Sequence, residues 1–225
     1  MVYEFHRYGG MKMKVRAFDW ILWLVTILLC AGIFMMPHVV PIHWNGQWEI
    51  DGYGSRYWVF LLAFLPIFVY YGMSLTKHID PKRMNLEKRQ KTYRIFQCGL
   101  TVFFIILAIF FEYMIFNPQG DIEIFIWLMM SLLLIGMGNY LPKVPQNYFF
   151  GVKTPWILAS EYVWKKTHKI SGYCFVMIGL INGISALVHF SYTYLVLMIG
   201  IIGMTVFIYV YSYFLFRKCS QKIDD

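Results

Sequence analysis

Charged residues are scarce in this sequence. Asp, Glu, Lys and Arg make up 14% of its 225 residues, whereas hydrophobic residues make up 59%. A soluble domain carries about a quarter charged residues, so this composition argues against an ordinary water-soluble fold. The chain has long apolar runs instead, which indicate lipid as the solvent. We therefore expect an integral membrane protein.

Motifs typical of an enzyme or a metal site are also missing. The sequence contains neither HExxH nor Gly-x-Ser-x-Gly, and its four cysteines show no CxxC or other ligand spacing. Glu161 and His168 are seven residues apart and could share a helix face, but no nucleophile or third ligand accompanies them. The histidines and acids of residues 37–56 lack a recognised metal spacing. We therefore expect no catalytic site, no metal and no cofactor.

Six apolar runs are long enough to cross a bilayer as helices that rise about 1.5 Å per residue. Helices are required because backbone polar groups cannot be left unpaired in lipid. The first run is too long for a signal peptide and lacks a small-residue cleavage site, so we expect it to remain as a span. The prediction is an all-α, polytopic membrane protein with six transmembrane helices. The runs are Ala17–Met36, Tyr57–Leu75, Ile95–Phe116, Ile124–Leu141, Ile170–Phe190 and Tyr194–Phe216.

The net charge of +8 is confined largely to alternate connections between these runs. Residues 1–16, 76–94 and 142–169 and the C-terminal tail hold nineteen Lys and Arg residues, whereas the other connections hold only Arg56. This asymmetry predicts that both termini are cytoplasmic and that residues 37–56 lie outside the cell. It also argues against nucleic acid as a partner. The basic 76–94 loop is expected to meet anionic membrane lipid.

Polar side chains inside a membrane are costly and usually face the interior of a helix bundle. Asn182, Ser185 and His189 share one face of the fifth predicted span, and Glu112 lies at a comparable depth in the third. We expect a Glu112–His189 contact, with both side chains reaching interfacial water as the alternative. A transporter or channel that uses this polar face is the main alternative function.

Small residues also share a face of the fifth span. Gly172, Gly179, Gly183 and Ala186 lie close together on a helical projection. Because small residues let helices approach closely in lipid, we expect this face to pack within the bundle, with a homodimer as the alternative.

The expected outer loop, residues 37–56, is rich in aromatic residues. Trp44, Trp48 and the rings that follow them suit the headgroup level of a membrane, where an aromatic side chain is half wet. Asn45-Gly46 and Asp51-Gly52 are turn dipeptides. The pattern predicts a compact loop suited to an amphipathic or apolar ligand.

The segment 139–169 holds three prolines, two tryptophans, five lysines and a single acid. Pro142 and Pro145 prevent the preceding helix from continuing. A new helix can begin at the proline after Thr154, or alternatively Ser160 can cap one. Interleaved aromatic and Lys residues are typical of an interfacial amphipathic helix and equally of a docking platform for a cytoplasmic partner.

Two stretches resemble the SdpI/YfhL family of bacterial membrane proteins. Gly138 to Gly172, GNYLPKVPQNYFFGVKTPWILASEYVWKKTHKISG, resembles the family signature across its whole length. Val40 to Trp58, VPIHWNGQWEIDGYGSRYW, is similar to the outer loop of an N-terminal module often found with it. The resemblance implies a two-span module over residues 1–94 and a four-span module over residues 95–225.

The resemblance also implies a function. It indicates a non-enzymatic protein of the bacterial cell membrane that protects its producer against an antimicrobial peptide toxin. Such a protein could also signal by holding a cytoplasmic transcriptional repressor at the membrane. The outer loop would meet the toxin through Pro41, His43, Trp44, Asn45 and Trp48. The cytoplasmic segment would signal or support the fold through Asn139, Pro142, Lys143, Asn147, Gly151, Lys153, Thr154, Pro155, Trp156, Glu161, Trp164, Lys166 and His168.

Overall fold

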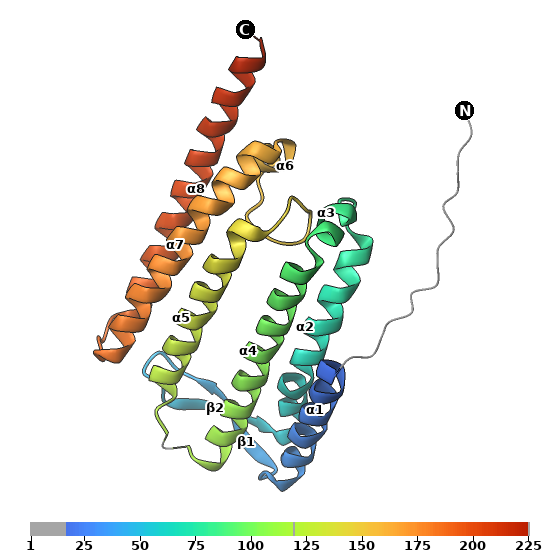
Figure 1. Cartoon of the computed structure of the whole chain (residues 1–225). Coiled ribbons are helices and arrows are strands. Elements are labelled where there is room, and N and C mark those ends of the chain that lie inside the picture. The colour runs from blue at the N-terminus through green and yellow to red at the C-terminus, as the bar shows by residue number, and fades with distance from the viewer. Residues whose placement is uncertain (1–16, 119, 225) are drawn as a thin grey trace, which may run out of the picture.

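A computed structural model describes residues 17–118 and 120–224, which form a helical bundle with one small sheet (Figure 1). Six helices are long and apolar enough to cross a membrane, which confirms the predicted number of spans. The basic residues of the predicted cytoplasmic N-terminus lie outside the described residues. The six helices are α1 (Ala17–Met35), α2 (Val59–Ile79), α4 (Gln90–Phe116), α5 (Ile122–Tyr140), α7 (Glu161–Leu187) and α8 (Thr193–Asp224).

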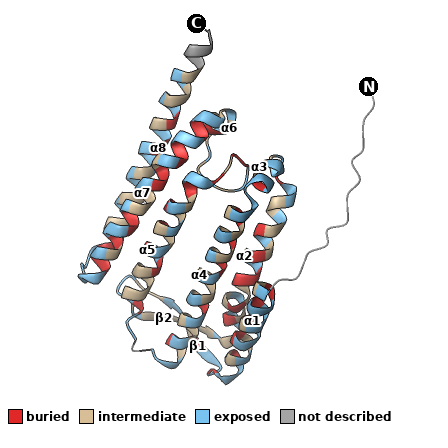
Figure 2. Ribbon diagram, in the orientation of Figure 1, coloured by how far each residue is buried: buried red, intermediate tan, exposed pale blue. Residues whose placement is uncertain are grey.

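The distribution of buried positions fits a lipid environment. In α1 the buried side chains, including Leu22 and Ile33, follow one face, whereas large apolar residues such as Ile27 and Leu28 are more than half exposed. The other helices show the same mixture of buried and exposed positions (Figure 2), and many of their exposed positions carry large apolar residues. Exposed apolar area of this extent is stable in lipid and costly in water.

The bundle has two distinct ends (Figure 1). The hairpin end carries strands β1 (Val39–Trp44) and β2 (Ile50–Ser55) together with the α4–α5 and α7–α8 turns. The connector end carries α3 (Arg83–Lys88), α6 (Pro155–Ala159) and the connector, which we define as residues 141–160. Within the described residues, the connections at the connector end are rich in Lys and Arg, whereas the hairpin end has Arg56 alone.

The helices associate as two groups. On one side α2 packs against α1 and α4, and on the other α7 packs against α5 and α8. Contact between α4 and α5 is sparse and includes two pairs of stacked rings, Phe110 on Phe125 and Phe96 on Tyr140. The predicted module boundary between residues 94 and 95 stays a prediction, although α4 contacts α2 more extensively than it contacts α5.

Glycines allow α5 and α7 to approach closely. A Cβ added to Gly138 or to Gly172 would lie 2.6 Å from the carbonyl oxygen of the other residue. A Cβ on Gly179 would lie 2.8 Å from the carbonyl oxygen of Ser131. These contacts confirm that the small-residue face packs within the bundle, and they leave that part of α7 covered by α5.

Two helix starts that the sequence left as alternatives both form. The Thr154 hydroxyl accepts from the Ile157 N–H at the start of α6, and the Ser160 hydroxyl accepts from the Val163 N–H at the start of α7. Helix α7 therefore begins at Glu161, nine residues before the predicted start of the fifth span. The helix is longer than the apolar run because hydropathy measures only the apolar length, whereas the first polar turns of α7 are held by packing against the connector.

Candidate functional site

The expected outer loop is a β-hairpin between α1 and α2. Its strands are antiparallel, with Val40 opposite Gly54 and Trp44 opposite Ile50. The register is irregular on both sides of His43, which lies opposite Gly52. A Cβ at Gly52 would come within 2.8 Å of the His43 Cβ, so this position requires glycine. Strand pairing satisfies the backbone groups that a loop would leave open to the membrane surface.

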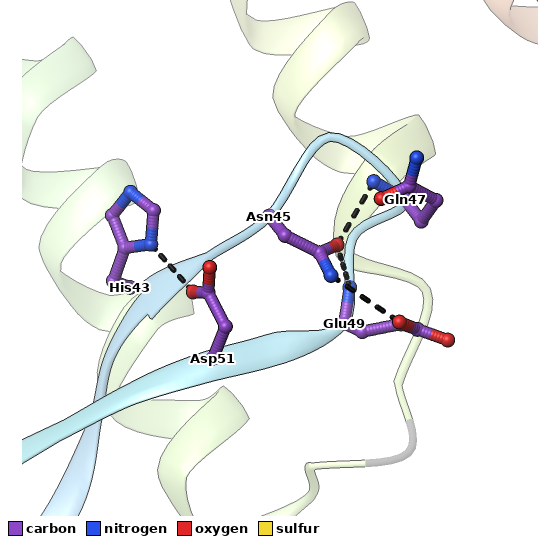
Figure 3. Close-up of polar contacts among 5 residues, drawn as sticks. All are labelled: His43, Asn45, Gln47, Glu49 and Asp51. Atoms are coloured by element: carbon purple, nitrogen blue, oxygen red, sulfur yellow. Dashed lines mark hydrogen bonds and ion pairs between the residues drawn. The ribbon is translucent and has the colours of Figure 1, made fainter.

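Asn45 organises the hairpin tip (Figure 3). Its side-chain oxygen accepts from the backbone N–H groups of Gln47 at 2.9 Å and Glu49 at 3.0 Å. Its amide nitrogen donates to the Glu49 carboxylate at 3.2 Å. Asn45 was expected to contact ligand. In the structure its side-chain oxygen and its amide nitrogen are instead hydrogen-bonded within the loop.

His43 and Asp51 form an exposed polar pair across the two strands (Figure 3). The His43 Nδ1 and an Asp51 carboxylate oxygen are 2.5 Å apart, and the two side chains are 69% and 44% exposed. Tyr53, opposite Pro41 in the register, is 63% exposed. The hairpin therefore presents one polar pair and one aromatic ring that are accessible to a ligand.

The two tryptophans expected to bind ligand also attach the hairpin to the bundle. The Trp44 ring lies 5.7 Å from the Phe111 ring on α4, and the Trp48 ring lies 5.7 Å from the Trp127 ring on α5 in an edge-to-face arrangement. The hairpin thereby contacts both helix groups, and Figure 1 shows it crossing their lower ends. These contacts position the hairpin rigidly against the spans.

An apolar hollow of about 360 Å³ lies beside β1 at the hairpin end. Its walls include Pro41 and Trp44 from the predicted site, Phe111 from α4 and Trp58, which directly precedes α2. Trp58 is 60% exposed. From the sequence, Trp58 is expected only to be an interfacial aromatic residue, because its place in this hollow depends on how the hairpin folds back on α2 and α4.

A second, polar hollow of about 260 Å³ lies at the hairpin tip. It brings Trp48 together with His189, two predicted site residues that come from distant parts of the sequence. Asp121 and Glu123, which the sequence analysis did not single out, also line it. Their nearest bonds are local, since Asp121 caps α5 and Glu123 accepts from the Trp127 indole N–H. The two hollows together give the hairpin end an apolar and an acidic surface.

The expected contact between Glu112 and His189 is not formed. Glu112 instead packs against α1, where a Cβ at Gly32 would lie 3.0 Å from its carboxylate. Among the described residues no hydrogen bond or ion pair joins Glu112 to His189. The prediction was wrong because similar depth does not imply the same side of a bundle, and α4 and α7 belong to different helix groups.

Asn182 and Ser185 link helices to one another. The Asn182 amide donates to the Ser131 hydroxyl at 2.8 Å and to the Trp127 carbonyl at 3.1 Å, which joins α7 to α5. Ser185 shares a 2.8 Å hydrogen bond with Thr193 at the start of α8. Both side chains are buried. These bonds give the polar face a packing role and offer no support for a transport path along it.

The connector is held by the 76–94 loop, for which the sequence predicted mainly a lipid-contacting role. The buried Asp80 carboxylate accepts from the backbone N–H groups of Lys82 at 2.6 Å and Tyr148 at 2.9 Å. The Lys82 ammonium donates to the Gln146 side chain at 2.6 Å, and Asn85 donates to the Gln146 carbonyl at 3.0 Å. The roles of Asp80 and Gln146 could not be predicted because their bonds between the loop and the connector join residues more than 60 positions apart.

Asn147 shapes the turn at the centre of the connector. Its amide donates to the carbonyls of Pro145 at 2.8 Å and Phe150 at 3.1 Å. Its side-chain oxygen accepts from the backbone N–H groups of Phe149 and Phe150. Asn147 is fully buried. This predicted signature residue therefore maintains the fold of the connector.

Trp164 and His168 are buried on α7 and pack against that turn of the connector. The Trp164 indole donates to the Val144 carbonyl at 2.9 Å, and the His168 ring stacks on it with centroids 4.0 Å apart. Gly151 sits above the His168 ring at φ +102°, where a side chain would collide with the ring. The positive φ and the close contact together require glycine at this position.

Other signature residues have mixed roles. The Trp156 indole donates to Ser212 of α8 at 2.8 Å, and the Lys153 ammonium donates to carbonyls of the connector turn. Glu161 forms an exposed ion pair with Lys165 at 2.8 Å, so it does not meet the buried His168.

The remaining predicted residues lie near the edges of the connector. Pro142 packs against α7, and Lys166 lies over the Tyr162 ring. Asn139 and Lys143 line a groove between α4 and α5. Tyr148, Phe149 and Tyr162 expose their rings at the connector end. The choice between an interfacial segment and a docking platform therefore stays a prediction.

The comparisons with known proteins match both stretches that the sequence analysis singled out. Residues 143–212 match the SdpI/YfhL protein family, and residues 20–67 match a domain of unknown function, DUF1648. The chain is also 23% identical over 185 residues to the protein described as immunity protein SdpI of Bacillus subtilis (strain 168), covering 82% of this chain and 87% of that protein. No solved structure gives a significant match.

The first match covers nearly all of the connector, including α6, and then α7 and most of α8. The second covers most of α1, the hairpin and the first part of α2. The segments that form the two candidate surfaces are therefore the segments that relate this chain to known proteins. The chain is a multi-pass membrane protein that is similar to the SdpI/YfhL family over residues 143–212.

Proposed function

We propose that this protein is a non-enzymatic immunity protein of the bacterial cell membrane that protects its producer from an antimicrobial peptide toxin. The observation that carries the proposal is the similarity to an immunity protein over 82% of the chain. The shared region is too long to reflect one generic apolar helix. It takes in both the hairpin end and the connector end, so it relates the whole architecture to that function.

The hairpin supports this proposal as the surface that meets the toxin. Its apolar hollow lies next to exposed Trp58, and the His43–Asp51 pair lies on the neighbouring strands. A peptide that partitions to a membrane surface has apolar and polar sides, and this arrangement offers a surface for each. We propose that the hairpin faces the outside of the cell and that the connector and both termini face the cytoplasm.

The proposal is tested by expressing the protein in a toxin-sensitive strain of Bacillus subtilis that lacks its immunity protein. The strain is challenged with the peptide toxin which that immunity protein counters. Survival should rise in cells that express the wild-type chain. Unchanged survival, with the protein shown to be inserted in the membrane, would contradict the proposal.

A matched pair of variants locates the recognition surface. Trp58→Ala removes a ring that is 60% exposed beside the hollow, whereas Trp20→Ala removes one that is 70% exposed on α1 away from it. We expect the first variant to lose protection and the second to keep it, at equal protein levels. Asn45→Ala is less informative because Asn45 shapes the loop, so loss of protection could report a misfolded hairpin.

We further propose that the connector docks a cytoplasmic transcriptional repressor. The supporting observation is that Tyr148 and Phe149 expose their rings on a turn whose backbone is fixed by Asp80 and Asn147. A Tyr148→Ala/Phe149→Ala variant should keep protection but lose toxin-dependent expression of genes under the repressor. A reporter that responds unchanged in this variant would contradict the docking role.

A further inference from the structure

A groove of about 340 Å³ runs between α4 and α5 in the half of the bundle nearest the connector. Two pairs of stacked rings keep the helices in contact. Phe110 stacks on Phe125 on the hairpin side of the groove, and Phe96 stacks on Tyr140 at the end of the groove near the connector. Between these contacts the helices do not close on each other. No residue of the hairpin or of its two hollows lines this groove, so the groove is a separate site.

Two glycines keep the groove open. Gly99 on α4 and Gly136 on α5 both line it, and a Cβ added at either position would meet no atom within 4 Å. Glycine is unfavourable inside a helix, and neither position needs it for close packing. Here the missing side chains leave empty space instead, in contrast to Gly138, whose Cβ would clash with α7.

The groove has the dimensions and polarity of a lipid chain site. From Ile95 to Ile106 it extends about 16 Å along α4, at about 1.5 Å per residue. This length is about half of the ~30 Å hydrocarbon core, so it corresponds to one leaflet. The lining is almost entirely apolar between its ends, where isoleucine, leucine, phenylalanine and methionine side chains face the space.

A positive charge marks the end of the groove near the connector. Lys143 lines it, and its ammonium group makes no hydrogen bond or ion pair within the described part of the chain. Lys91 and Arg94 line an adjoining hollow, which shares Ile95 with the groove. A ligand that fits this site has an apolar chain and an anionic head at one end.

We propose that the α4–α5 groove binds one anionic phospholipid from the leaflet at the connector end, with an acyl chain between Gly99 and Gly136 and its phosphate at Lys143. The charge at the groove's end selects an anionic lipid over a zwitterionic one. An apolar helix from a second copy would not use an unpaired lysine at the groove's end. The site is separate from the hairpin surface, so it stands independently of toxin recognition.

The test uses the full-length protein purified in detergent, with native mass spectrometry after addition of phosphatidylglycerol or phosphatidylcholine. The wild-type chain should retain one phosphatidylglycerol and bind it in preference to phosphatidylcholine. Gly136→Leu should fill the groove, since a Cβ at this position meets nothing within 4 Å, and should abolish retention. Gly72→Leu is the matched control, because a Cβ at Gly72 on α2 also meets nothing within 4 Å and Gly72 does not line the groove.

Two further variants test the second wall of the groove and the charge at its end. Gly99→Leu blocks the groove from its other wall and should also abolish retention, which covers the case that Gly136→Leu fails to fold. Lys143→Gln should leave the groove open but lower the preference for phosphatidylglycerol about fivefold, the factor expected for one basic residue near an anionic surface. Equal lipid retention in Gly136→Leu and Gly72→Leu would overturn the proposal. So would a wild-type dimer without lipid that Gly136→Leu converts to monomer.

Discussion

Two glycines in one turn of α5 should respond to the same substitution with different changes in stability. A Cβ at Gly138 would lie 2.6 Å from the Gly172 carbonyl oxygen and 2.9 Å from the Val176 backbone nitrogen. A Cβ at Gly136 would meet nothing within 4 Å. Backbone atoms cannot rotate away, so Gly138→Ala must separate α5 from α7.

The size of the difference follows from packing. Overpacking a close contact costs about 1–3 kcal/mol. The spans stay helical in the denatured state reached in detergent, because lipid-like surroundings leave the backbone no other partner, so the helix propensity of alanine contributes little to either variant. We therefore expect Gly138→Ala to lower the free energy of unfolding by about 1–3 kcal/mol relative to Gly136→Ala.

The assay is unfolding in mixed micelles with increasing sodium dodecyl sulfate, followed by tryptophan fluorescence. Both variants differ from the wild type by one methyl group and lie two residues apart, so expression and insertion effects are matched. A Gly138→Ala variant as stable as Gly136→Ala would refute the close α5–α7 packing on which the position of the connector depends.

Three other substitutions test separate parts of the structure. Asp80→Ala should destabilise the connector by about 1.5–3 kcal/mol for each charge-assisted hydrogen bond lost, which increased proteolysis of the connector would report. Glu161→Ala, which removes an exposed ion pair, should leave the rate of proteolysis unchanged. Asn45→Ala should speed hydrogen exchange at the hairpin tip with no change in the helices, and unchanged exchange would argue against its turn role. Asn182→Leu should cost about 1 kcal/mol of stability through the lost bond to Ser131, and a variant as stable as the wild type would contradict that contact.

The sequence predicts the spans well because a membrane imposes one length and one polarity on every helix that crosses it. It also places the connector between α5 and α7, since prolines such as Pro142 and Pro145 stop a helix locally. Helix α7 exceeds its predicted length because the turn around Trp164 and His168 is stabilised by the distant Val144 and by Gly151, not by hydropathy.

The roles of the site residues were harder to predict than their positions. The residue types of Trp44, Asn45 and Trp48 indicate a binding loop. Residue type alone does not show which of their atoms are already engaged in contacts within the fold. Asn45 is used within the loop, and the two tryptophans are used partly in docking to α4 and α5. The pairing of Asp80 with the connector depends on the chain after α5 reaching the end of α2, which no local pattern encodes.

The roles proposed for the hairpin and the connector require that these two segments lie on opposite sides of the membrane. Tyr53→Cys and Tyr148→Cys are each introduced into a variant that lacks the four native cysteines. Each resulting protein has one thiol, at the hairpin end or at the connector end. The native Tyr53 and Tyr148 are 63% and 45% exposed. In intact cells, a membrane-impermeant maleimide should label Tyr53→Cys and should label Tyr148→Cys only after the membrane is opened. Labelling of both thiols from the same side would contradict the topology and, with it, the roles proposed for both ends.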